Sequence, residues 1–365
     1  MRQQFHLSLD AVNVLYLFST IVYSLTSFYI GRLMARFGSG TTLLAGATIM
    51  VGCLLGIAIS PTWALVIAFS TISGLGNGIV DAGLNLYVAT YHTPQQMSWL
   101  HACFGIGITV GPLIMTFALQ QALGWQFGYA IVGTLLILLV LLFASTRHLW
   151  RNEGLQTAEN EPVRRAGFVE TLRTPVVWLS MATFLAYVGM EIGIGQWAYT
   201  LLTESRHMPP EMAGPSVSLY WGTFAGGRFL FGLIANRFRT SSVLRVCMLA
   251  TIVGVVLFWW NPADAVGILG LVVTGAAQAP IFPLLMSDTA QRVGAEHAEN
   301  GISMQMGAVG IGTAILPGLI GTIGKNLGLE TMAASFVVMS LVVFGCYQLT
   351  ALVRARQPAL IRAGG

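Results

Sequence analysis

Residues 31–38 read Gly31-Arg32-Leu33-Met34-Ala35-Arg36-Phe37-Gly38, and residues 232–239 read Gly232-Leu233-Ile234-Ala235-Asn236-Arg237-Phe238-Arg239. A shift of 201 positions places glycine on glycine, arginine on arginine and phenylalanine on phenylalanine in these two stretches. A shift of 205 carries Gly105-Ile106-Gly107 onto Gly310-Ile311-Gly312. The pattern predicts two related halves arranged as a parallel repeat. The apolar stretch 175–202 has no counterpart in the first half, because the chain begins at Met1 opposite Leu202.

The composition indicates that lipid surrounds much of the chain. Hydrophobic residues make up 55% of the 365 residues, and charged residues only 9%. A soluble globular chain carries roughly 25% charged residues, so this composition excludes an ordinary water-soluble protein. The 42 glycines favour helices that pack closely through small residues.

Eleven apolar stretches are long enough to cross a bilayer as helices. Each helix satisfies its own backbone hydrogen bonds in lipid, and no alternation typical of a barrel is present. We therefore predict an all-α integral membrane protein with eleven transmembrane helices. The stretches are 11–30, 41–59, 63–90, 98–119, 127–145, 175–202, 213–235, 242–260, 264–287, 302–323 and 331–353.

Loop charges predict the orientation and the division of the chain. Fourteen basic residues fall in one set of loops and three in the opposite set, which places the first set and the C-terminus in the cytoplasm. The polar stretch 146–174 separates the halves. We expect an N-terminal lobe of five helices at 1–145, a cytoplasmic linker at 146–174 and a C-terminal lobe of six helices at 175–365.

Ionisable residues inside the apolar stretches are the best functional candidates, because a charge at the bilayer centre costs about 3 kcal/mol or more. Asn77, Asp81 and Asn85 recur every four residues and form one polar stripe on a helix. Gly74 and Gly78 lie near the same face, and we expect them to leave open space beside a watery cavity. A polar contact between two helices is the alternative role for Asp81.

The second half contributes another carboxyl and a basic residue. Tyr187 and Glu191 share a helix face among glycines, which let either a neighbouring helix or a ligand approach. A buried carboxyl can exchange protons, so Asp81 and Glu191 are both candidates for proton coupling; a structural hydrogen bond is the alternative for Glu191. Arg228 pairs with a membrane carboxylate, contacts an anionic or hydroxylated substrate, or extends to the cytoplasmic interface.

Two prolines predict a break in the stretch 264–287. Pro280 and Pro283 each remove a backbone donor, and Gln278 lies beside them, opposite Asn77 in the repeat. Broken helices at mid-membrane commonly bind the solute in transporters, although a simple packing kink is the alternative. His101 lies near the cytoplasmic end of its stretch, so we expect it to be exposed.

The sequence predicts no enzyme. It contains no phosphate-binding loop, no catalytic triad order and no metal-ligand spacing, so we expect no catalytic residues, no metal, no cofactor and no nucleic-acid partner.

These stretches together resemble the major facilitator superfamily. Its cytoplasmic loop signature, Gly-x-Leu-Ala-Asp-Arg-x-Gly, is matched by Gly31, Leu33, Arg36 and Gly38, and the second half repeats it with Gly232 and Arg237. The resemblance implies a two-lobe helix bundle in which these loops contribute to gating. Ala35 stands at the aspartate position of the signature, which puts the usual charge contact of that gate in doubt.

Within the superfamily the chain is similar to the fucose permease branch of sugar–proton symporters. The resemblance rests on Gly74-Leu75-Gly76 followed by Asp81-x-x-x-Asn85, on residues 187–195, and on Ala279-Pro280-Ile281-Phe282-Pro283. In that branch an acidic residue on the fourth helix takes part in coupling, and Asp81 occupies the matching position. The superfamily has twelve helices, and the first has no match here. A start site placed too late, a truncated inactive gene, or an eleven-helix form that works with a partner would each account for this.

We expect a secondary transporter, a multi-pass monomer in a bacterial inner membrane, that carries a small polar solute such as a sugar by proton symport with alternating access. The alternatives are a proton-coupled efflux antiporter for drugs and a non-transporting membrane protein. Substrate would bind between the halves, and its expected ligands are Asn77, Asp81, Asn85, Tyr187, Glu191, Gln196 and Gln278.

Overall fold

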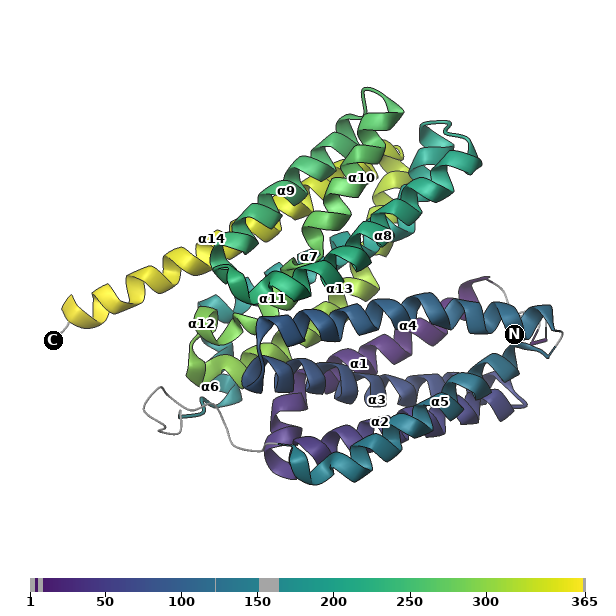
Figure 1. Ribbon diagram of the computed structural model, residues 1–365, viewed down its shortest axis with the longest axis horizontal. Coiled ribbons are helices and arrows are strands. Elements are labelled where there is room, and N and C mark those ends of the chain that lie inside the picture. Colours follow the sequence, from purple (N-terminus) through teal and green to yellow (C-terminus); the bar gives the residue numbers. More distant parts are fainter. Residues whose placement is uncertain (1–3, 6–8, 122, 151–163, 364–365) are drawn as a thin grey trace. The chain divides into compact units, whose positions relative to one another are not determined.

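The computed structural model describes residues 4–5, 9–121, 123–150 and 164–363, and these ranges are helical with no strand (Figure 1). Side chains are described in the same ranges except at 9–16, 108, 109, 112, 116 and 355–363. The long helices are α1 (Leu9–Phe37), α2 (Ser39–Ile59), α3 (Trp63–Tyr91), α4 (Pro94–Gln120), α5 (Trp125–Thr146), α7 (Pro175–Thr200), α8 (Pro210–Ile234), α9 (Thr240–Trp260), α10 (Asp264–Gln278), α13 (Ala298–Leu327) and α14 (Glu330–Ala363). The short ones include α6 (Phe168–Leu172), α11 (Ile281–Ser287), α12 (Thr289–Val293), η3 (Ala235–Arg237) and η4 (Ala295–His297).

All eleven predicted apolar stretches coincide with helices. Among the described residues, eight helical segments are long and apolar enough to cross a membrane, and three further stretches lie in α1, α4 and α8. The all-α membrane fold is therefore confirmed, whereas eleven crossings stay a prediction.

Prolines and glycines set several helix ends. Pro175 and Pro210 lie in the first turns of α7 and α8, where a missing backbone N–H costs nothing. Gly38 separates α1 from α2 with φ 82° and ψ 150°, a backbone conformation that residues other than glycine rarely adopt. The geometry of this turn thus follows from the lack of a Cβ atom at Gly38.

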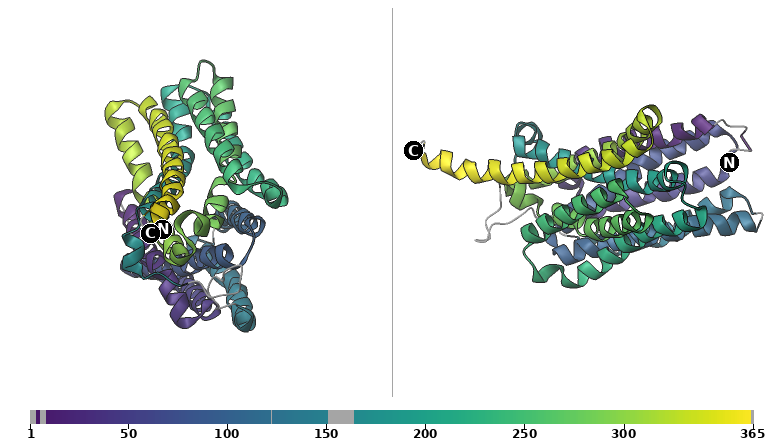
Figure 2. Two further views of the ribbon diagram at one scale, coloured as in Figure 1. Left: turned by 90° about the vertical axis from the view of Figure 1, so that its left-hand side faces the viewer. Right: turned by 90° about the horizontal axis from the view of Figure 1, so that it is seen from above.

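Contacts divide the chain into two compact units, each described by itself. The first unit comprises Met1–Thr90, Cys103–Val163 and Ile302–Gly310, and the second comprises Tyr91–Ala102, Arg164–Gly301 and Ile311–Gly365. In the first unit α2 packs along α5. In the second, α9 packs along α10, and α14 packs along both α7 and α9. The end of α14 extends beyond its neighbours α7 and α9 (Figure 2). The division into lobes at 146–174 stays a prediction.

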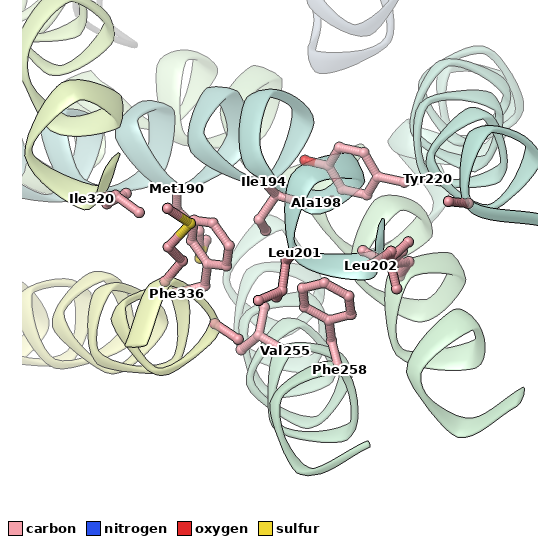
Figure 3. Packing of buried hydrophobic residues seen from close by; sticks show 14 of the residues in the cluster. Met190, Ile194, Ala198, Leu201, Leu202, Tyr220, Val255, Phe258, Ile320 and Phe336 are labelled. Atoms are coloured by element: carbon pink, nitrogen blue, oxygen red, sulfur yellow. The ribbon is translucent and has the colours of Figure 1, made fainter. Parts of the chain in front are cut away.

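A hydrophobic core holds the second unit together. Figure 3 shows Met190 and Ile194 of α7 packed with Val255 and Phe258 of α9 and with Phe336 of α14, and all five side chains are buried. Close packing through glycine, expected from composition, is clearest between α9 and α10. A Cβ atom at Gly270 would lie 2.5 Å from the backbone nitrogen of Phe258 and 2.7 Å from the carbonyl oxygen of Gly254.

The predicted break in the stretch 264–287 is present. Helix α10 ends at Gln278, residues 279 and 280 form a turn, and α11 begins at Ile281. Pro280 and Pro283 donate no backbone hydrogen bond, and the loss of two donors within four residues weakens the helical ladder at this point.

Candidate functional site

A buried ion pair lies between α7 and α8 in the second unit. Glu191 is 7% exposed and Arg228 is 4% exposed. Glu191 Oε2 lies 3.6 Å from Arg228 Nη2, and the guanidinium carbon of Arg228 lies 4.0 Å from the centre of the Phe224 ring. Of the roles considered for Arg228, the structure shows pairing with a membrane carboxylate, and contact with a substrate stays a prediction. Burial of both charges is tolerable only because each neutralises the other.

Two tyrosines connect this pair to the end of α10. The Tyr187 hydroxyl donates to the backbone carbonyl of Gln278 at 2.8 Å. The Tyr220 hydroxyl lies 2.8 Å from Gln278 Oε1 and 3.2 Å from the Glu191 carbonyl oxygen. Helices α7, α8 and α10 thus place their polar groups in one cluster, which we call the α7–α8–α10 cluster: Tyr187, Glu191, Tyr220, Arg228 and Gln278.

Three buried polar atoms of this cluster have no hydrogen-bond partner among the described residues. They are Glu191 Oε2, Arg228 Nε and Gln278 Nε2. Buried polar atoms are normally paired, and unpaired ones cost about 1–3 kcal/mol each. The cluster therefore offers one acceptor and two donors for a polar group with both functions, such as a hydroxyl.

The glycines around Glu191 serve helix packing. A Cβ atom at Gly189 would meet the side chain of Leu316, and one at Gly193 would meet Ile320 and Phe336. The neighbouring helices α13 and α14 therefore occupy the space beside these glycines. Gln196 lies further along α7 with an exposed side chain, and it takes no part in the contacts described for this cluster.

A second polar cluster, here the α1–α3 cluster, lies in the first unit. The Tyr23 hydroxyl donates to Asp81 Oδ2 at 2.7 Å, and Asn85 Nδ2 donates to Asp81 Oδ1 at 3.0 Å. Both oxygens of this carboxylate are therefore bonded. Asn77 Nδ2 donates to Ser73 Oγ at 3.2 Å, so Asn77 bonds within its own helix. The bond from Tyr23 makes Asp81 part of a polar contact between α1 and α3.

The expectation of open space beside Gly74 and Gly78 was wrong. A Cβ atom at Gly74 would meet the backbone of Ser19, and one at Gly78 would lie 2.8 Å from the carbonyl oxygen of Tyr23. These glycines let α1 approach α3 closely, which brings the Tyr23 hydroxyl to Asp81.

The expectation that His101 is exposed was also wrong. His101 is 8% exposed, and its ring contacts Phe282 of α11 edge-on, with ring centres 4.7 Å apart. Tyr23 and Tyr220 were missed at the level of sequence. For Tyr220 a signal existed, because Tyr220, Phe224 and Arg228 recur every four residues along α8.

The two loops of the repeated motif differ in their contacts. In the first unit the Gly31 N–H donates to Ser303 Oγ at 3.0 Å, and exposed Arg36 lies over the Phe37 ring at 5.4 Å. In the second, buried Gly232 abuts Trp99, since a Cβ atom there would lie 2.6 Å from the indole. Arg237 is exposed in η3.

A local ion pair explains Asp288, which follows α11. Asp288 Oδ2 lies 3.7 Å from Arg292 Nε, one helical turn on. Burial raises the pKa of the Asp288 carboxyl, and the charges of Arg292 and Arg354 oppose that rise. Arg292 also donates to Ser180 Oγ at 3.2 Å and to the Leu285 carbonyl oxygen. These contacts connect α12 to the first turns of α7 and to the end of α11.

Comparisons with known proteins agree on one family. The model of the Major Facilitator Superfamily matches residues 1–303 and 201–363. The glucose/mannose transporter GlcP of Bacillus subtilis is 22% identical over 357 residues, covering 94% of this chain and 86% of that protein. Bypass of stop codon protein 6 of Saccharomyces cerevisiae is 22% identical over 361 residues, covering 90% of this chain and 72% of that protein.

The solved structures give the same fold. The crystal structure of the Major Facilitator Superfamily transporter FucP in the outward conformation matches with a TM-score of 0.77. Its sequence is 16% identical, and the match covers 95% of this chain and 92% of that chain.

Proposed function

Because the chain belongs to the Major Facilitator Superfamily of membrane transporters and resembles its fucose permease branch, we propose that it accumulates a small polar solute, a sugar, by proton symport with alternating access. Two carboxylates within apolar helices, buried Glu191 and half-buried Asp81, support this proposal. In the α7–α8–α10 cluster Glu191 is held beside Arg228, and in the α1–α3 cluster Asp81 is held by Tyr23 and Asn85. Membrane helices rarely retain such groups unless they serve a polar pathway.

The observation that carries the proposal is the incomplete hydrogen bonding of the α7–α8–α10 cluster. Acceptor and donor atoms of three side chains, Glu191, Arg228 and Gln278, are left without partners among the described residues here, whereas the structural pair of Asp288 and Arg292 leaves only Arg292 Nε unpaired. Hydroxyl groups of a sugar both donate and accept, so they complement this set. We propose that both clusters serve the solute path, with Asp81 and Glu191 exchanging the coupled proton.

The sugar specificity follows the relatives in part. GlcP is named a glucose/mannose transporter, and FucP is named a fucose–proton symporter in a second structure with the same TM-score of 0.77. At 22% and 16% identity these similarities show the fold of the chain. The proposal that the solute is a sugar therefore depends on the polar groups of the two clusters.

Uptake into proteoliposomes tests the proposal. We expect glucose, mannose or fucose to accumulate when the outside is acidic, and accumulation to stop when a protonophore removes the gradient. Asp81→Asn and Glu191→Gln should abolish accumulation, while exchange of labelled for unlabelled sugar across the membrane survives. Glu204 is an exposed carboxylate near the end of the membrane segment that contains α7. Glu204→Gln is therefore the matched control and should transport normally.

Two results would contradict this mechanism. Accumulation that remains intact in both Asp81→Asn and Glu191→Gln would remove these carboxyls from coupling. Resistance to hydrophobic drugs without uptake of any sugar would instead favour an efflux antiporter.

A further inference from the structure

Two arginines with buried side chains, among the residues that the structure describes, face a glutamate, and they bind it in different ways. Arg206 grips Glu330 with the Nε and Nη2 edge of its guanidinium, at 2.9 Å to Oε1 and 2.9 Å to Oε2. This is the bidentate geometry that arginine adopts with carboxylates. A carboxylate thus occupies the Nε and Nη2 edge of Arg206, while its Nη1 has no hydrogen-bond partner among the described residues.

The same edge of Arg228 is not saturated. Its Nη2 lies 3.6 Å from Glu191 Oε2, beyond the length of a hydrogen bond, and its Nε has no hydrogen-bond partner among the described residues. Glu191 therefore neutralises Arg228 without occupying its carboxylate-binding edge. The Phe224 ring covers the guanidinium at 4.0 Å, which holds it in place.

Charge decides what can bind there. While Glu191 is ionised, the pair is neutral, and an added anion would bring an unbalanced buried charge. Once Glu191 takes a proton, Arg228 becomes a buried cation without a counter-ion. An anionic group and a proton would then enter together, because each removes the penalty that the other creates.

We propose that the solute is a hydroxylated monocarboxylate, a sugar acid, whose carboxylate binds the Nε and Nη2 edge of Arg228 when Glu191 is protonated. This inference rests on the proposed function, since it names the solute class for the same cluster. The unpaired Gln278 Nε2 donor serves a solute hydroxyl. His101, Tyr187 and Tyr220 are the other titratable groups that act on the pair from α4, α7 and α8.

The charge balance of one cycle follows. A proton from the acidic side binds the Glu191 carboxylate, and one monoanion binds Arg228. Both leave on the other side, where Glu191 releases its proton and returns to Arg228. The net movement is one proton and one negative charge, so transport carries no current. A neutral sugar moved with a proton would carry one positive charge for each cycle.

Matched pairs of probes test this proposal in proteoliposomes of the full chain. We would compare D-glucuronate with D-glucose and D-galacturonate with D-galactose, which differ at C6 alone. We expect the uronates to accumulate with an inward proton gradient, and their uptake to be unchanged when potassium and valinomycin set the membrane potential. Their affinity should fall as the external pH rises from 5.5 to 7.5.

Variants separate binding from coupling. Arg228→Gln should raise the KM for uronates at least about tenfold, because it removes a charged hydrogen-bonding partner, and Arg228→Lys should recover part of that loss. Glu191→Gln should bind uronates at pH 7.5 as well as at pH 5.5, yet fail to accumulate them. Arg239→Gln, on the exposed end that follows η3, is the control. The comparison of uronates with neutral sugars uses the wild-type protein alone. It therefore tests the sugar-acid proposal even if Arg228→Gln is unstable.

The possible results distinguish failure of the sugar-acid proposal from failure of the proposed symport. Proton-driven accumulation of the neutral sugars, with uronates neither transported nor competing, would overturn the sugar-acid proposal and leave the proposed symport standing. Uptake of uronates that follows the membrane potential would overturn the charge balance. If a proton gradient drives neither member of either pair, both the proposed function and this inference fail.

Discussion

The contact between α9 and α10 makes Gly270→Ala a demanding test of the packing. A Cβ atom there would lie 2.5 Å from the backbone nitrogen of Phe258, whereas ordinary contact begins at 3.4 Å. The atoms in the way belong to the backbone, so no side chain can rotate aside. The two helices would have to separate by about 0.9 Å along the contact, or bend to the same effect.

That separation has an energetic consequence that can be bracketed. A gap of 0.5–1 Å forfeits about a quarter to a half of the dispersion energy at each affected contact, and overpacking of this kind costs about 1–3 kcal/mol. Alanine regains about 1 kcal/mol because it favours a helix more than glycine does. We expect a net effect between about zero and a loss of about 2 kcal/mol in the free energy of unfolding.

Gly345→Ala is the matched control. Gly345 lies inside α14 in the same unit, and a Cβ atom there would meet nothing within 4 Å. Alanine should therefore stabilise the protein by about 0.5–1 kcal/mol through helix propensity alone. Both variants gain the same helix propensity, so Gly270→Ala should be less stable than Gly345→Ala by the overpacking cost of about 1–3 kcal/mol.

The measurement is reversible unfolding in mixed dodecylmaltoside and dodecyl sulfate micelles, followed by the fluorescence of the nine tryptophans. Gly254→Ala should behave like Gly270→Ala, since a Cβ atom there would lie 2.8 Å from the Thr274 nitrogen. The double variant should lose less than the sum, because one separation relieves both clashes. Equal stabilisation by Gly270→Ala and Gly345→Ala would refute the close approach of α9 and α10.

Three further perturbations follow from single contacts. Tyr23→Phe removes the 2.7 Å hydrogen bond to Asp81 and should slow proton-driven uptake about tenfold, as expected for a bond to a charged group. Tyr199 is exposed, so Tyr199→Phe is the control and should leave the uptake rate unchanged. Equal uptake rates of the two variants in proteoliposomes would exclude Tyr23 from the mechanism. Glu330→Ala leaves Arg206, whose side chain is 6% exposed, without its carboxylate and should lower the free energy of unfolding in micelles by about 3 kcal/mol. Arg206→Met leaves Glu330, whose side chain is 47% exposed, in contact with solvent and should lower it by about 1 kcal/mol. The reverse order of the two losses would contradict this account. Gly38→Ala places a Cβ atom at φ 82° and should lower the free energy of unfolding by about 2 kcal/mol, and a neutral effect would mean that the turn relaxes without strain.

Much of the fold could be predicted from the sequence, because lipid imposes a simple rule on it. A stretch of about 20 apolar residues must satisfy its own backbone hydrogen bonds, so it forms a helix. The break between α10 and α11 was predictable for the same reason, since Pro280 and Pro283 lack the donors that the rule requires.

The polar clusters could be predicted in part only. Asp81 and Glu191 were identified because ionisable groups are rare in such helices. Their partners depend on which helix faces lie together, and the sequence does not contain that information locally. Tyr23 and Tyr220 look like any other aromatic residues in an apolar stretch until the structure brings their hydroxyls to Asp81 and Gln278.

Two wrong expectations have the same origin. Glycine beside a polar stripe is compatible with open space and with a close helix, and at Gly74 the backbone of α1 fills the position. His101 was placed by its distance from a helix end, but Phe282, distant in sequence, covers its ring. In both cases a long-range contact decides burial.

The turn at residues 279 and 280 has a lasting mechanical consequence. Pro280 and Pro283 remove two backbone donors within four residues, and α10 and α11 are separate helices at this point, whereas α13 runs unbroken through its single Pro317. Helix α9 beside it is continuous from Thr240 to Trp260 and has no such interruption. The membrane segment of α10 and α11 thus has fewer backbone hydrogen bonds next to Gln278, and we expect its bending to concentrate there.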